Sequence, residues 1–333
     1  MFHVKLTLTT MLDTMNSSAH RPVVVADVDT GIDDALAITY LGYLHRRGLI
    51  ELRITTSAGN CTAEQAAANS AEIMNSLTLS DVPITPGAPK PRALPLTTTP
   101  ETHGPTGLGY HTTRATIPQL SNAAAAVDLW KGADYLLVAG PATNVAWAAE
   151  NENAPEVLNA IPHVTFMTGA FHYPGNTTPT AEWNAWVDPH ALKEALAHYR
   201  GHAVRPTICP LNVTESVLLT PQRLKQWCQR SQEPVLPILS DALRFYFEFH
   251  ESVGVGYMAQ IHDLAAAMVL LNRVPHTTRP GFVDVEADAE LTRGTTVVDW
   301  DSNYGDHPAN AQILTALQSE DVFAEFERVV LEY

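Results

Sequence analysis

The stretch PVVVADVDTGIDDALA, residues 22–37, decides the fold of this chain. Its first five residues form an apolar run that is typical of a buried parallel strand, and the residues from Ala35 onward carry an apolar face at helical spacing. Gly31 stands between the two segments and supplies the backbone freedom that a tight turn needs. The stretch therefore predicts a strand, a sharp turn and a helix, which is the repeating unit of a parallel α/β sheet.

The predicted turn is strongly acidic. Four aspartates stand within eight residues, namely Asp27, Asp29, Asp33 and Asp34. Their charges repel one another, and a helix N-terminus offsets only about half a unit of negative charge. A divalent cation would offset the rest, and carboxylate oxygens suit a hard ion such as calcium or magnesium. Aspartate is also a good helix cap, so capping alone would explain one or two of the four.

Strand-like and helix-like segments alternate beyond this stretch. The predicted strands are residues 22–26, 49–57, 134–139, 163–168 and 203–210, with at most a short strand in 81–95; the predicted helices are 62–77, one that begins near Thr143, and 189–199. This alternation predicts an α/β fold with an open, mostly parallel, Rossmann-like sheet and helices on both faces.

The C-terminal third follows a different pattern. It predicts helices at residues 234–253 and 263–272, a small peripheral antiparallel hairpin formed by 282–290 and 295–300, and a final helix from Ala309 onward. No linker, repeat or low-complexity tract interrupts the sequence. We therefore expect a single α/β domain over residues 22–333, preceded by an N-terminal extension, residues 1–21, for which disorder is one hypothesis.

Composition narrows the class of partner. The formal net charge is −16, from 20 Lys and Arg against 36 Asp and Glu, which argues against a nucleic-acid surface and fits a metal ion or a neutral or cationic small ligand. The three cysteines form no CxxC pair, so neither a disulfide framework nor a structural zinc site is indicated. No segment has the continuous apolar character of a signal peptide or a membrane span, and we expect a soluble, cytoplasmic protein.

Polar residues follow several predicted strands at the point where each strand ends. Asn60 follows the second strand, the segment 140–144 follows the strand at 134–139, and Met167 lies at the end of the next one. Ligands of open α/β sheets bind outside the carboxyl ends of the strands. These positions therefore predict a binding site at that edge of the sheet.

Three further segments carry candidate site residues. Glu182 and Asn184 point the same way in an extended loop and suit paired hydrogen bonds to vicinal hydroxyls, although a solvated loop has the same pattern. His262 and Asp263 begin a predicted helix, where Asp263 is either an N-cap or a metal ligand beside an imidazole acid. His103 lies in a glycine-rich loop that by itself indicates only flexibility.

Two known motifs are excluded, and a third stays open. An EF-hand needs glycine at its sixth position and glutamate at its twelfth, where this chain has Ile32 and Ile38. No GxxxxGK[ST] P-loop follows the first strand. A haloacid-dehalogenase-type phosphatase, with an aspartate nucleophile and magnesium, also has a DxD sequence after its first strand. It remains the alternative, although Thr30-Gly31 inverts its usual order and the Asp33-Asp34 pair is not expected there.

Taken together and in order, the motifs resemble those of the nucleoside hydrolases, the inosine/uridine-preferring N-ribohydrolase family, whose hallmark is a DTDPGIDDALA-like sequence. This chain has DVDTGIDDALA at residues 27–37. The similarity continues through ITTSAGN (54–60), HG (103–104), GPATN (140–144), AEWN (181–184), VDP (187–189), HD (262–263) and LTRGTTVVD (291–299). Two departures are Thr30 in place of the usual proline and MTGA at 167–170 in place of a Met-Gly-Gly run.

The resemblance implies calcium-dependent hydrolysis of the N-glycosidic bond of ribonucleosides, of the uridine, cytidine and inosine type, to free base and ribose. One calcium ion per subunit would be held by Asp29, Asp34, Asp263 and the backbone carbonyl of Ala139, with Asp27 as a supporting residue. The metal would bind the ribose 2′- and 3′-hydroxyls and acidify a water. A homodimer or homotetramer would be usual for the family.

The resemblance also implies roles in catalysis. Asp29 would act as general base toward the water, with inversion at the anomeric carbon, and His262 would protonate the leaving base. The residues implied to bind the substrate are Asp33, Asn60, Glu182 and Asn184 at the sugar hydroxyls, Asn176 near the 5′ end, Met167 under the sugar, His103 beside the base, and Tyr246 or Tyr257 from the segment before His262. The preferred base is not predicted.

Overall fold

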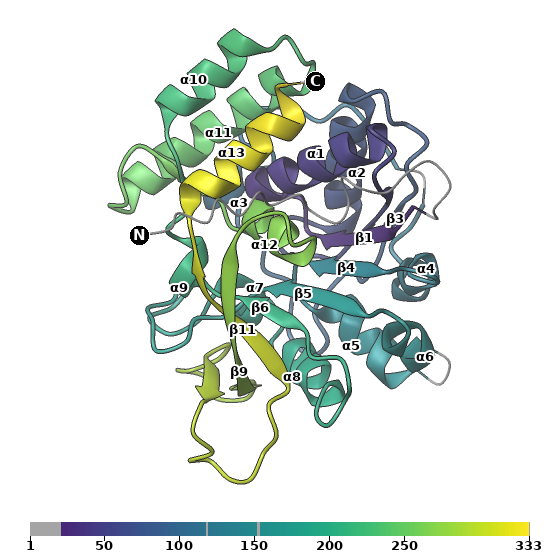
Figure 1. The fold of residues 1–333 in the computed structure, drawn as a ribbon, viewed down its shortest axis with the longest axis vertical. Coiled ribbons are helices and arrows are strands. Elements are labelled where there is room, and N and C mark those ends of the chain that lie inside the picture. The colour runs from purple at the N-terminus through teal and green to yellow at the C-terminus, as the bar shows by residue number, and fades with distance from the viewer. Residues whose placement is uncertain (1–20, 118, 152–153, 333) are drawn as a thin grey trace, which may run out of the picture.

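A nine-stranded sheet runs through the computed structural model, which describes residues 21–117, 119–151 and 154–332 (Figure 1). The strand order is β10-β9-β11-β6-β5-β4-β1-β2-β3. The strands from β11 to β3 pair in parallel, and β9 and β10 add antiparallel at the β11 edge. The bounds are β1 Val23–Val28, β2 Glu51–Thr56, β3 Ile84–Pro86, β4 Tyr135–Val138, β5 His163–Met167, β6 Thr207–Cys209, β9 His276–Val285, β10 Thr296–Asp299 and β11 Ala311–Leu317. The predicted mostly parallel α/β sheet is confirmed.

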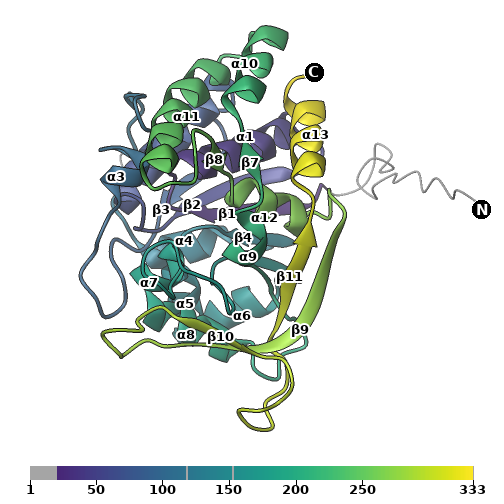
Figure 2. The same cartoon turned by 90° about the vertical axis from the view of Figure 1, so that its left-hand side faces the viewer.

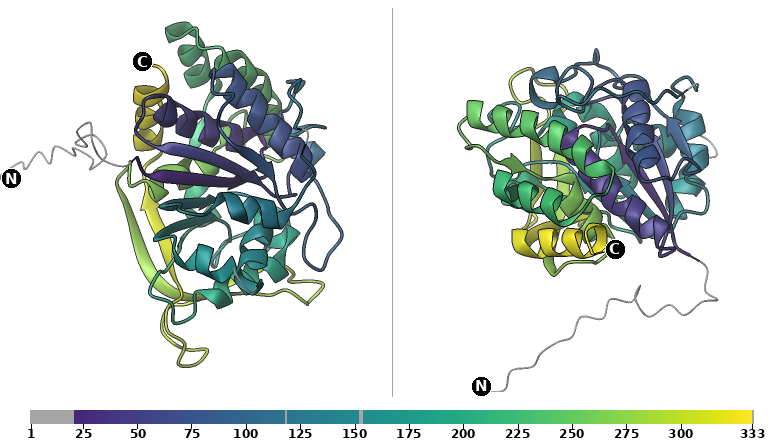
Figure 3. Two further views of the ribbon diagram at one scale, coloured as in Figure 1. Left: turned by 90° about the vertical axis from the view of Figure 1, so that its right-hand side faces the viewer. Right: turned by 90° about the horizontal axis from the view of Figure 1, so that it is seen from above.

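Helices cover both faces of this sheet, and each face has its own hydrophobic core (Figures 2 and 3). The helices that contribute to the larger core are α1 Ile32–Arg46, α2 Ala63–Ser76, α10 Pro221–Arg230, α11 Val235–Ser252, α12 Asp263–Leu270 and α13 Ser319–Val330. Those of the opposite core are α4 Ala123–Leu129, α5 Thr143–Glu150, α6 Ala154–Asn159 and α8 Pro189–His198. Three short helices and a two-stranded antiparallel sheet complete the described elements: α3 Pro100–His103, α7 Trp183–Val187, α9 Leu211–Thr214, and β7 Leu218–Leu219 paired with β8 Ala259–Gln260.

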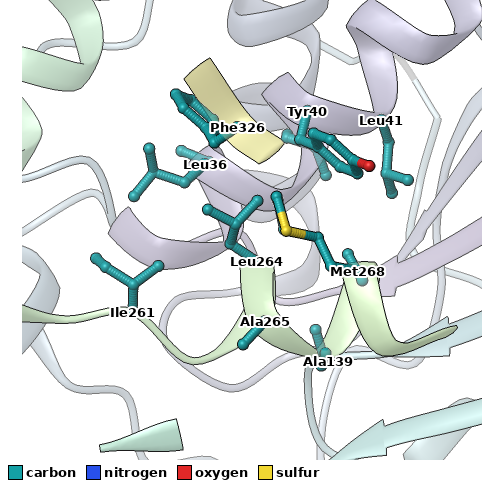
Figure 4. Close-up of a cluster of buried hydrophobic side chains, with 14 of the residues drawn as sticks. Leu36, Tyr40, Leu41, Ala139, Ile261, Leu264, Ala265, Met268 and Phe326 are labelled. Carbon is teal, nitrogen blue, oxygen red and sulfur yellow. The ribbon is translucent and has the colours of Figure 1, made fainter. Parts of the chain in front are cut away.

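The two helices that follow the acidic turn and the His262-Asp263 pair meet in the larger core. Leu36 and Tyr40 of α1 lie against Leu264 and Met268 of α12, and Phe326 of α13 covers them (Figure 4). All five side chains are fully or almost fully buried. Two segments more than two hundred positions apart in the chain are therefore held side by side by apolar packing.

One predicted element at the C-terminus is wrong. Residues 311–317, assigned to a final helix from Ala309, form strand β11, and the helix begins at Ser319. The segment AQILTAL has good helix formers, but β6 and β9 offer backbone partners on both sides of it. Tertiary pairing therefore decides its conformation.

The predicted antiparallel pair is confirmed, with different extents. It is formed by β9 and β10, and β9 begins at His276 and ends at Val285. Because β9 also pairs with β11, the two strands extend the edge of the main sheet (Figure 2). Residues 1–20 of the predicted extension lie outside the described residues. Within the described residues, no helix combines the length and apolar character needed to cross a bilayer.

Candidate active site

The carboxyl ends of β1, β2, β4 and β5 open into a cavity of about 520 Å³. The charged side chains that line it are all acidic, apart from three histidines, and the described lining contains no lysine or arginine. The lining residues that the sequence singled out are Asp33, Asn60, His103, Ala139, Met167, Asn176, Glu182, Asn184, Tyr246, His262 and Asp263. The structure therefore brings most of the candidates together at this edge of the sheet. The candidates that do not line the cavity are Asp27, Asp29, Asp34 and Tyr257.

The turn after β1 is rigidly hydrogen-bonded. The Asp34 carboxylate accepts the Gly31 N–H at 2.8 Å, which stabilises the first turn of α1. Asn60, which follows β2, holds this turn by three hydrogen bonds. Its backbone N–H donates to Asp29 Oδ2 at 2.7 Å, and its side-chain amide donates to Asp29 Oδ1 at 3.1 Å and to Asp34 Oδ2 at 3.2 Å. The capping explanation thus applies to Asp34 but leaves Asp29 and Asp33 without a structural role at the helix.

Four buried aspartates, Asp29, Asp33, Asp34 and Asp263, form what we call the acidic cluster. Oxygens of Asp33, Asp34 and Asp263 lie within 4.8 Å of one another. Burial, followed by the charge of Asp33, raises the pKa of Asp34 to about 7. Burial also raises the pKa of Asp29 and of Asp263, and the neighbouring carboxylates add to both increases. Such a concentration of desolvated negative charge requires either protons or a cation.

The residues of the acidic cluster fit a hard divalent cation. All donors are oxygens, and the buried Oδ1 of Asp34 has no hydrogen-bond partner among the described residues. Oxygens of Asp33 and Asp263 lie so close that a proton or a cation between them would offset the repulsion of their charges. This grouping differs from the set implied by the resemblance, which has Asp29 rather than Asp33 at the metal.

Asp27 lies one layer deeper and does not line the cavity. Its Oδ1 accepts the Thr55 hydroxyl at 2.7 Å and the Asn144 amide at 2.8 Å. Burial raises its pKa to about 6, and these two hydrogen bonds lower it again in part. Because Asn144 also donates to the Thr56 carbonyl at 3.0 Å, the Asp27 carboxylate ties β1 to β2 and to the start of α5.

Glu182 and Asn184 are buried, at 2% and 6% exposure, so the solvated-loop explanation for this pair is wrong. Glu182 accepts the N–H groups of Asn184 at 2.7 Å and Ala185 at 3.0 Å and so caps α7. The Asn184 amide donates to the carbonyls of Ala139 at 2.7 Å and Met167 at 3.0 Å. The pair therefore links the ends of β4 and β5 below the cavity.

Asn176 lies in the loop before α7, six residues before Glu182. Its Oδ1 accepts the Trp183 N–H at 3.0 Å, which holds the loop against the cavity. Trp183 lines the cavity but was not a candidate from the sequence.

His103 and His262 are both buried, and burial lowers the pKa of each to about 3. His103 Nδ1 accepts the Ile32 N–H at 3.0 Å, at the first residue of α1. A backbone N–H can only donate, so the ring carries its proton on Nε2. His262 Nδ1 lies 2.8 Å from the Thr214 hydroxyl, which donates to the Pro210 carbonyl. His262 therefore donates through Nδ1–H.

Tyr246 and Tyr257 differ in position. Tyr246 is buried and lines the cavity, with its ring 5.2 Å from that of His103. Tyr257 is 41% exposed, packs on Phe247 at 5.5 Å, and does not line the cavity. Of the two alternatives for the base, the structure brings only Tyr246 to the site.

Several lining residues were not candidates from the sequence, above all Phe249, His250 and Gln260. Tyr246, Phe249 and His250 are spaced i, i+3, i+4 on α11, so their common face was available as a signal. The rings of His103, Tyr246, Phe249 and His250 form what we call the aromatic wall. Centroid distances within it run from 4.3 Å for Tyr246–His250 to 6.3 Å for Tyr246–Phe249.

An acidic, oxygen-lined cavity of small-molecule size at the carboxyl ends of a parallel sheet is typical of an α/β enzyme, and its acidic cluster could bind a cation. The sequence model of the family described as inosine-uridine preferring nucleoside hydrolase matches residues 24–324, and the chain belongs to this family. The resemblance seen in the sequence is thereby confirmed.

Curated relatives extend over nearly the whole chain. The chain is 32% identical over 307 residues to the pyrimidine-specific ribonucleoside hydrolase RihA of Shewanella sp. (strain ANA-3), covering 90% of this chain and 93% of the relative. It is 33% identical over 309 residues to the non-specific ribonucleoside hydrolase RihC of Salmonella agona, covering 91% and 94%.

Solved structures agree in fold. The purine-preferring ribonucleoside hydrolase from Gardnerella vaginalis superposes with a TM-score of 0.80 at 25% identity, covering 93% of this chain and 98% of that one. A plant nucleoside hydrolase, the PpNRh1 enzyme, superposes with a TM-score of 0.82 at 22% identity, covering 94% and 100%.

The chain is therefore an enzyme that hydrolyses the N-glycosidic bond of ribonucleosides to free base and ribose. The phosphatase alternative is not supported, because every comparison places the DxD sequence within a nucleoside hydrolase. The family is metal-dependent, and the acidic cluster is a group that could bind the metal.

Proposed function

We propose that this protein hydrolyses ribonucleosides of the uridine, cytidine and inosine type with one calcium ion per subunit and with inversion at the anomeric carbon. The observation that carries the proposal is the acidic cluster, four buried carboxylates of which those of Asp33 and Asp263 line a cavity without a lysine or arginine in its described lining. Calcium takes six to eight oxygen ligands, whereas magnesium usually keeps several of its waters. A site with several carboxylates therefore suits calcium better than magnesium.

Asp29, Asp34, Asp263 and the Ala139 carbonyl are the proposed metal ligands. The unpartnered Oδ1 of Asp34 and the position of Ala139 on the cavity wall support this set. When bound, the calcium ion would hold the ribose 2′- and 3′-hydroxyls and lower the pKa of a water. Asp27 supports the site from behind through its bonds to Thr55 and Asn144.

Asp29 is the proposed general base. Both of its oxygens accept hydrogen bonds from Asn60, which fix the carboxylate plane while leaving lone pairs for the water proton. A single displacement by this water, on the face opposite the base, inverts the anomeric carbon.

Asp33, Asn60, Glu182 and Asn184 are proposed to bind the sugar hydroxyls, with Asn176 toward the 5′ end and Met167 under the ring. Their positions in the cavity lining, and the burial of all of them except the exposed Asn176, support this assignment. The negative potential of the carboxylates also stabilises the oxocarbenium-like transition state.

His262 is the proposed acid for the departing base; because its Nδ1–H is donated to Thr214, it would act from Nε2 after taking up a second proton there. It lies next to Asp263 and is oriented by Thr214, which places it between the acidic cluster and the aromatic wall. His103 and Tyr246 line the same end of the cavity. His103 offers an Nε2–H because Ile32 holds its other nitrogen.

The direct test is release of ribose from uridine and inosine, with calcium, after chelation, and after calcium is restored. Activity that needs calcium but no phosphate is expected, and a phosphate requirement would point to a phosphorylase instead. Asp29→Asn should abolish turnover and largely retain nucleoside binding, measured by calorimetry. Ribose released as the α-anomer in the first seconds, seen by NMR, would support inversion, since the substrates are β-nucleosides.

A single domain over residues 22–333, a homodimer or homotetramer, and a cytoplasmic location are also proposed. The continuous sheet from β1 to β11 supports the single domain. Light scattering in solution tests the oligomeric state, and a single calorimetric unfolding transition tests the domain assignment.

A further inference from the structure

Thr30 stands in the acidic turn between Asp29 and Asp33, and it has no part in the mechanism proposed above. It is also one of the two positions at which the chain departs from the family sequence. Thr30 is fully buried and does not line the cavity. Buried polar groups need hydrogen-bond partners, and both the hydroxyl and the carbonyl of Thr30 find theirs on helix α2, which contributes no residue to the described cavity lining.

The hydroxyl of Thr30 is bonded in one direction. It lies 2.7 Å from the hydroxyl of Ser70, which is also fully buried. Ser70 donates its single hydroxyl proton to the Ala66 carbonyl at 2.9 Å, one helical turn earlier. Ser70 can therefore only accept from Thr30, so the donation runs from Thr30 to Ser70 to Ala66.

The carbonyl of Thr30 is held by Asn69, the residue before Ser70. The Asn69 amide donates to the Thr30 carbonyl at 3.0 Å and to the Thr106 carbonyl at 2.7 Å. Its oxygen accepts the Gln65 amide at 2.9 Å and the Thr113 hydroxyl at 2.6 Å. Because both carbonyls can only accept, the Asn69 nitrogen must face them, and the orientation of the carboxamide is fixed.

The acidic turn is thus held from two sides. Asn60 donates to the carboxylates of Asp29 and Asp34, and α2 holds Thr30 between them. The charges of the acidic cluster repel one another and act to spread this turn when no cation lies among them. A turn that is already held in place needs less of the binding free energy of a cation for its own ordering.

We propose that Thr30 and Ser70 are positioning residues of the cation site, whose hydrogen bond keeps the acidic turn in the arrangement that binds the ion. The inference rests on the proposed function, since the ion that it concerns is the proposed calcium ion. Neither side chain lines the cavity, so both act through the carboxylates on either side of Thr30. The expected effect is therefore on calcium affinity and not on turnover by the calcium-loaded enzyme.

The experiment measures the calcium dissociation constant by calorimetry, and kcat for uridine at saturating calcium. Ser70→Ala removes the acceptor and leaves the buried Thr30 hydroxyl without its partner. The dissociation constant should rise about tenfold, as expected for one buried donor that is left unpaired. The value of kcat at saturating calcium should stay within about twofold of the wild type.

The donor side of the bond gives a second, smaller effect. Thr30→Val removes the donor, but Ser70 keeps its bond to Ala66, so no donor is left unpaired and the dissociation constant should rise only about threefold. The double variant Thr30→Val/Ser70→Ala should bind calcium no more weakly than Ser70→Ala alone, because the two side chains act as one unit. Thr30→Ser keeps the hydroxyl and should retain the wild-type affinity.

Thr39→Val is the matched control. Thr39 is also fully buried, in α1, but its hydroxyl has no hydrogen-bond partner among the described residues, so this substitution should leave calcium affinity unchanged. Melting temperatures check that each variant is folded. If Ser70→Ala does not fold, the comparison of Thr30→Val with Thr30→Ser decides the same question.

Two results separate this inference from the proposed function. Folded Ser70→Ala and Thr30→Val proteins that bind calcium as tightly as Thr39→Val would show that the hydrogen bond is merely structural, and they would overturn this inference alone. A wild type that binds no calcium would overturn the proposed function as well.

Discussion

The acidic cluster draws three of its four carboxylates from one short turn between β1 and the start of α1, whereas the aromatic wall combines the end of α3 with the last two turns of α11. The acidic cluster is at most 5% exposed, and Asn60 donates hydrogen bonds to two of its carboxylates. The aromatic wall borders Val253 and Val255, which are 57% and 37% exposed beside two glycines with positive φ, Gly254 and Gly256. The proposed metal site thus comes from one short, hydrogen-bonded turn, and the proposed base site lies next to a solvent-exposed loop.

Replacing a ligand in the acidic cluster should have the largest effect. Asp34→Asn removes one negative charge from the centre of the cluster and leaves Gly31 its hydrogen-bond acceptor. We expect kcat/KM for uridine to fall on the order of 10³-fold, because the cation supplies several kcal/mol of transition-state stabilisation. Steady-state ribose release and calcium titration check this, and full activity at the same calcium concentration would contradict the assignment.

Replacing Glu182, which is proposed to bind the sugar hydroxyls, should lower kcat/KM less than replacing Asp34. Glu182→Gln keeps the volume but loses the charge that accepts the N–H groups of Asn184, Ala185 and Gly169. Hydrogen bonds to charged groups contribute roughly 1.5–3 kcal/mol, so kcat/KM should fall about 10- to 100-fold. The matched variant Glu286→Gln also changes a carboxylate that accepts two backbone N–H groups, but it lies outside the cavity lining and should have no effect on kcat/KM.

Two tyrosines test the aromatic wall itself. Tyr246→Ala removes a buried ring between His103 and His250 and should lower kcat/KM about tenfold or more. Tyr257→Ala removes a ring that is 41% exposed and outside the cavity lining, and its effect should stay within about twofold. Equal losses in the two variants would show that the loop after α11 closes onto the base.

The stability of the calcium-free enzyme should depend on pH in the direction opposite to ordinary acid denaturation. The pKa of Asp34 is raised from its usual 3.8 to about 7 in the folded state, so the folded protein binds more protons than the unfolded chain between these values. Its contribution to stability is complete below about pH 4 and is lost as the pH rises to about 7.

Calorimetry of the chelated protein should therefore show a melting temperature at pH 8 that is lower than at pH 5.5, by roughly a few degrees. Asp34→Asn should reduce this difference, and added calcium should remove it, because the ion binds the charged form. A chelated wild type that is more stable at pH 8 would contradict a proton-dependent acidic cluster.

Local sequence patterns were sufficient to predict the strands and helices of the first half of the fold and the residues of the acidic cluster. The apolar run before Asp27 and the helical face after Asp34 are contained in one stretch, so periodicity alone predicts β1 and α1. The predicted helix at residues 311–317 was wrong because β11 pairs with β6 and β9, and a local sequence pattern does not reveal such pairing. His250 was missed for a different reason: its spacing from Tyr246 and Phe249 on α11 was a local signal that was not used.

The division of ligands within the acidic cluster shows a second limit. The family motif implied Asp29 at the metal and Asp33 at the sugar, while the structure brings Asp33 into the compact group with Asp34 and Asp263. Both carboxylates project from the same turn, and side-chain rotation decides between the two arrangements. Sequence spacing fixes which residues reach the site but not which oxygen faces the ion.

The packing of α1 on α12 has a consequence for ion selectivity. Both helices begin at the acidic cluster, α1 one residue before Asp33 and α12 at Asp263 itself, and Leu36, Leu264 and Met268 lock them together behind it (Figure 4). The apolar packing of these side chains thus determines the distance between the Asp34 and Asp263 carboxylates, which are remote in sequence. Apolar packing therefore sets the radius of the cation that the proposed ligands can hold. Shortening the Met268 side chain would change that radius, although Met268 does not line the cavity.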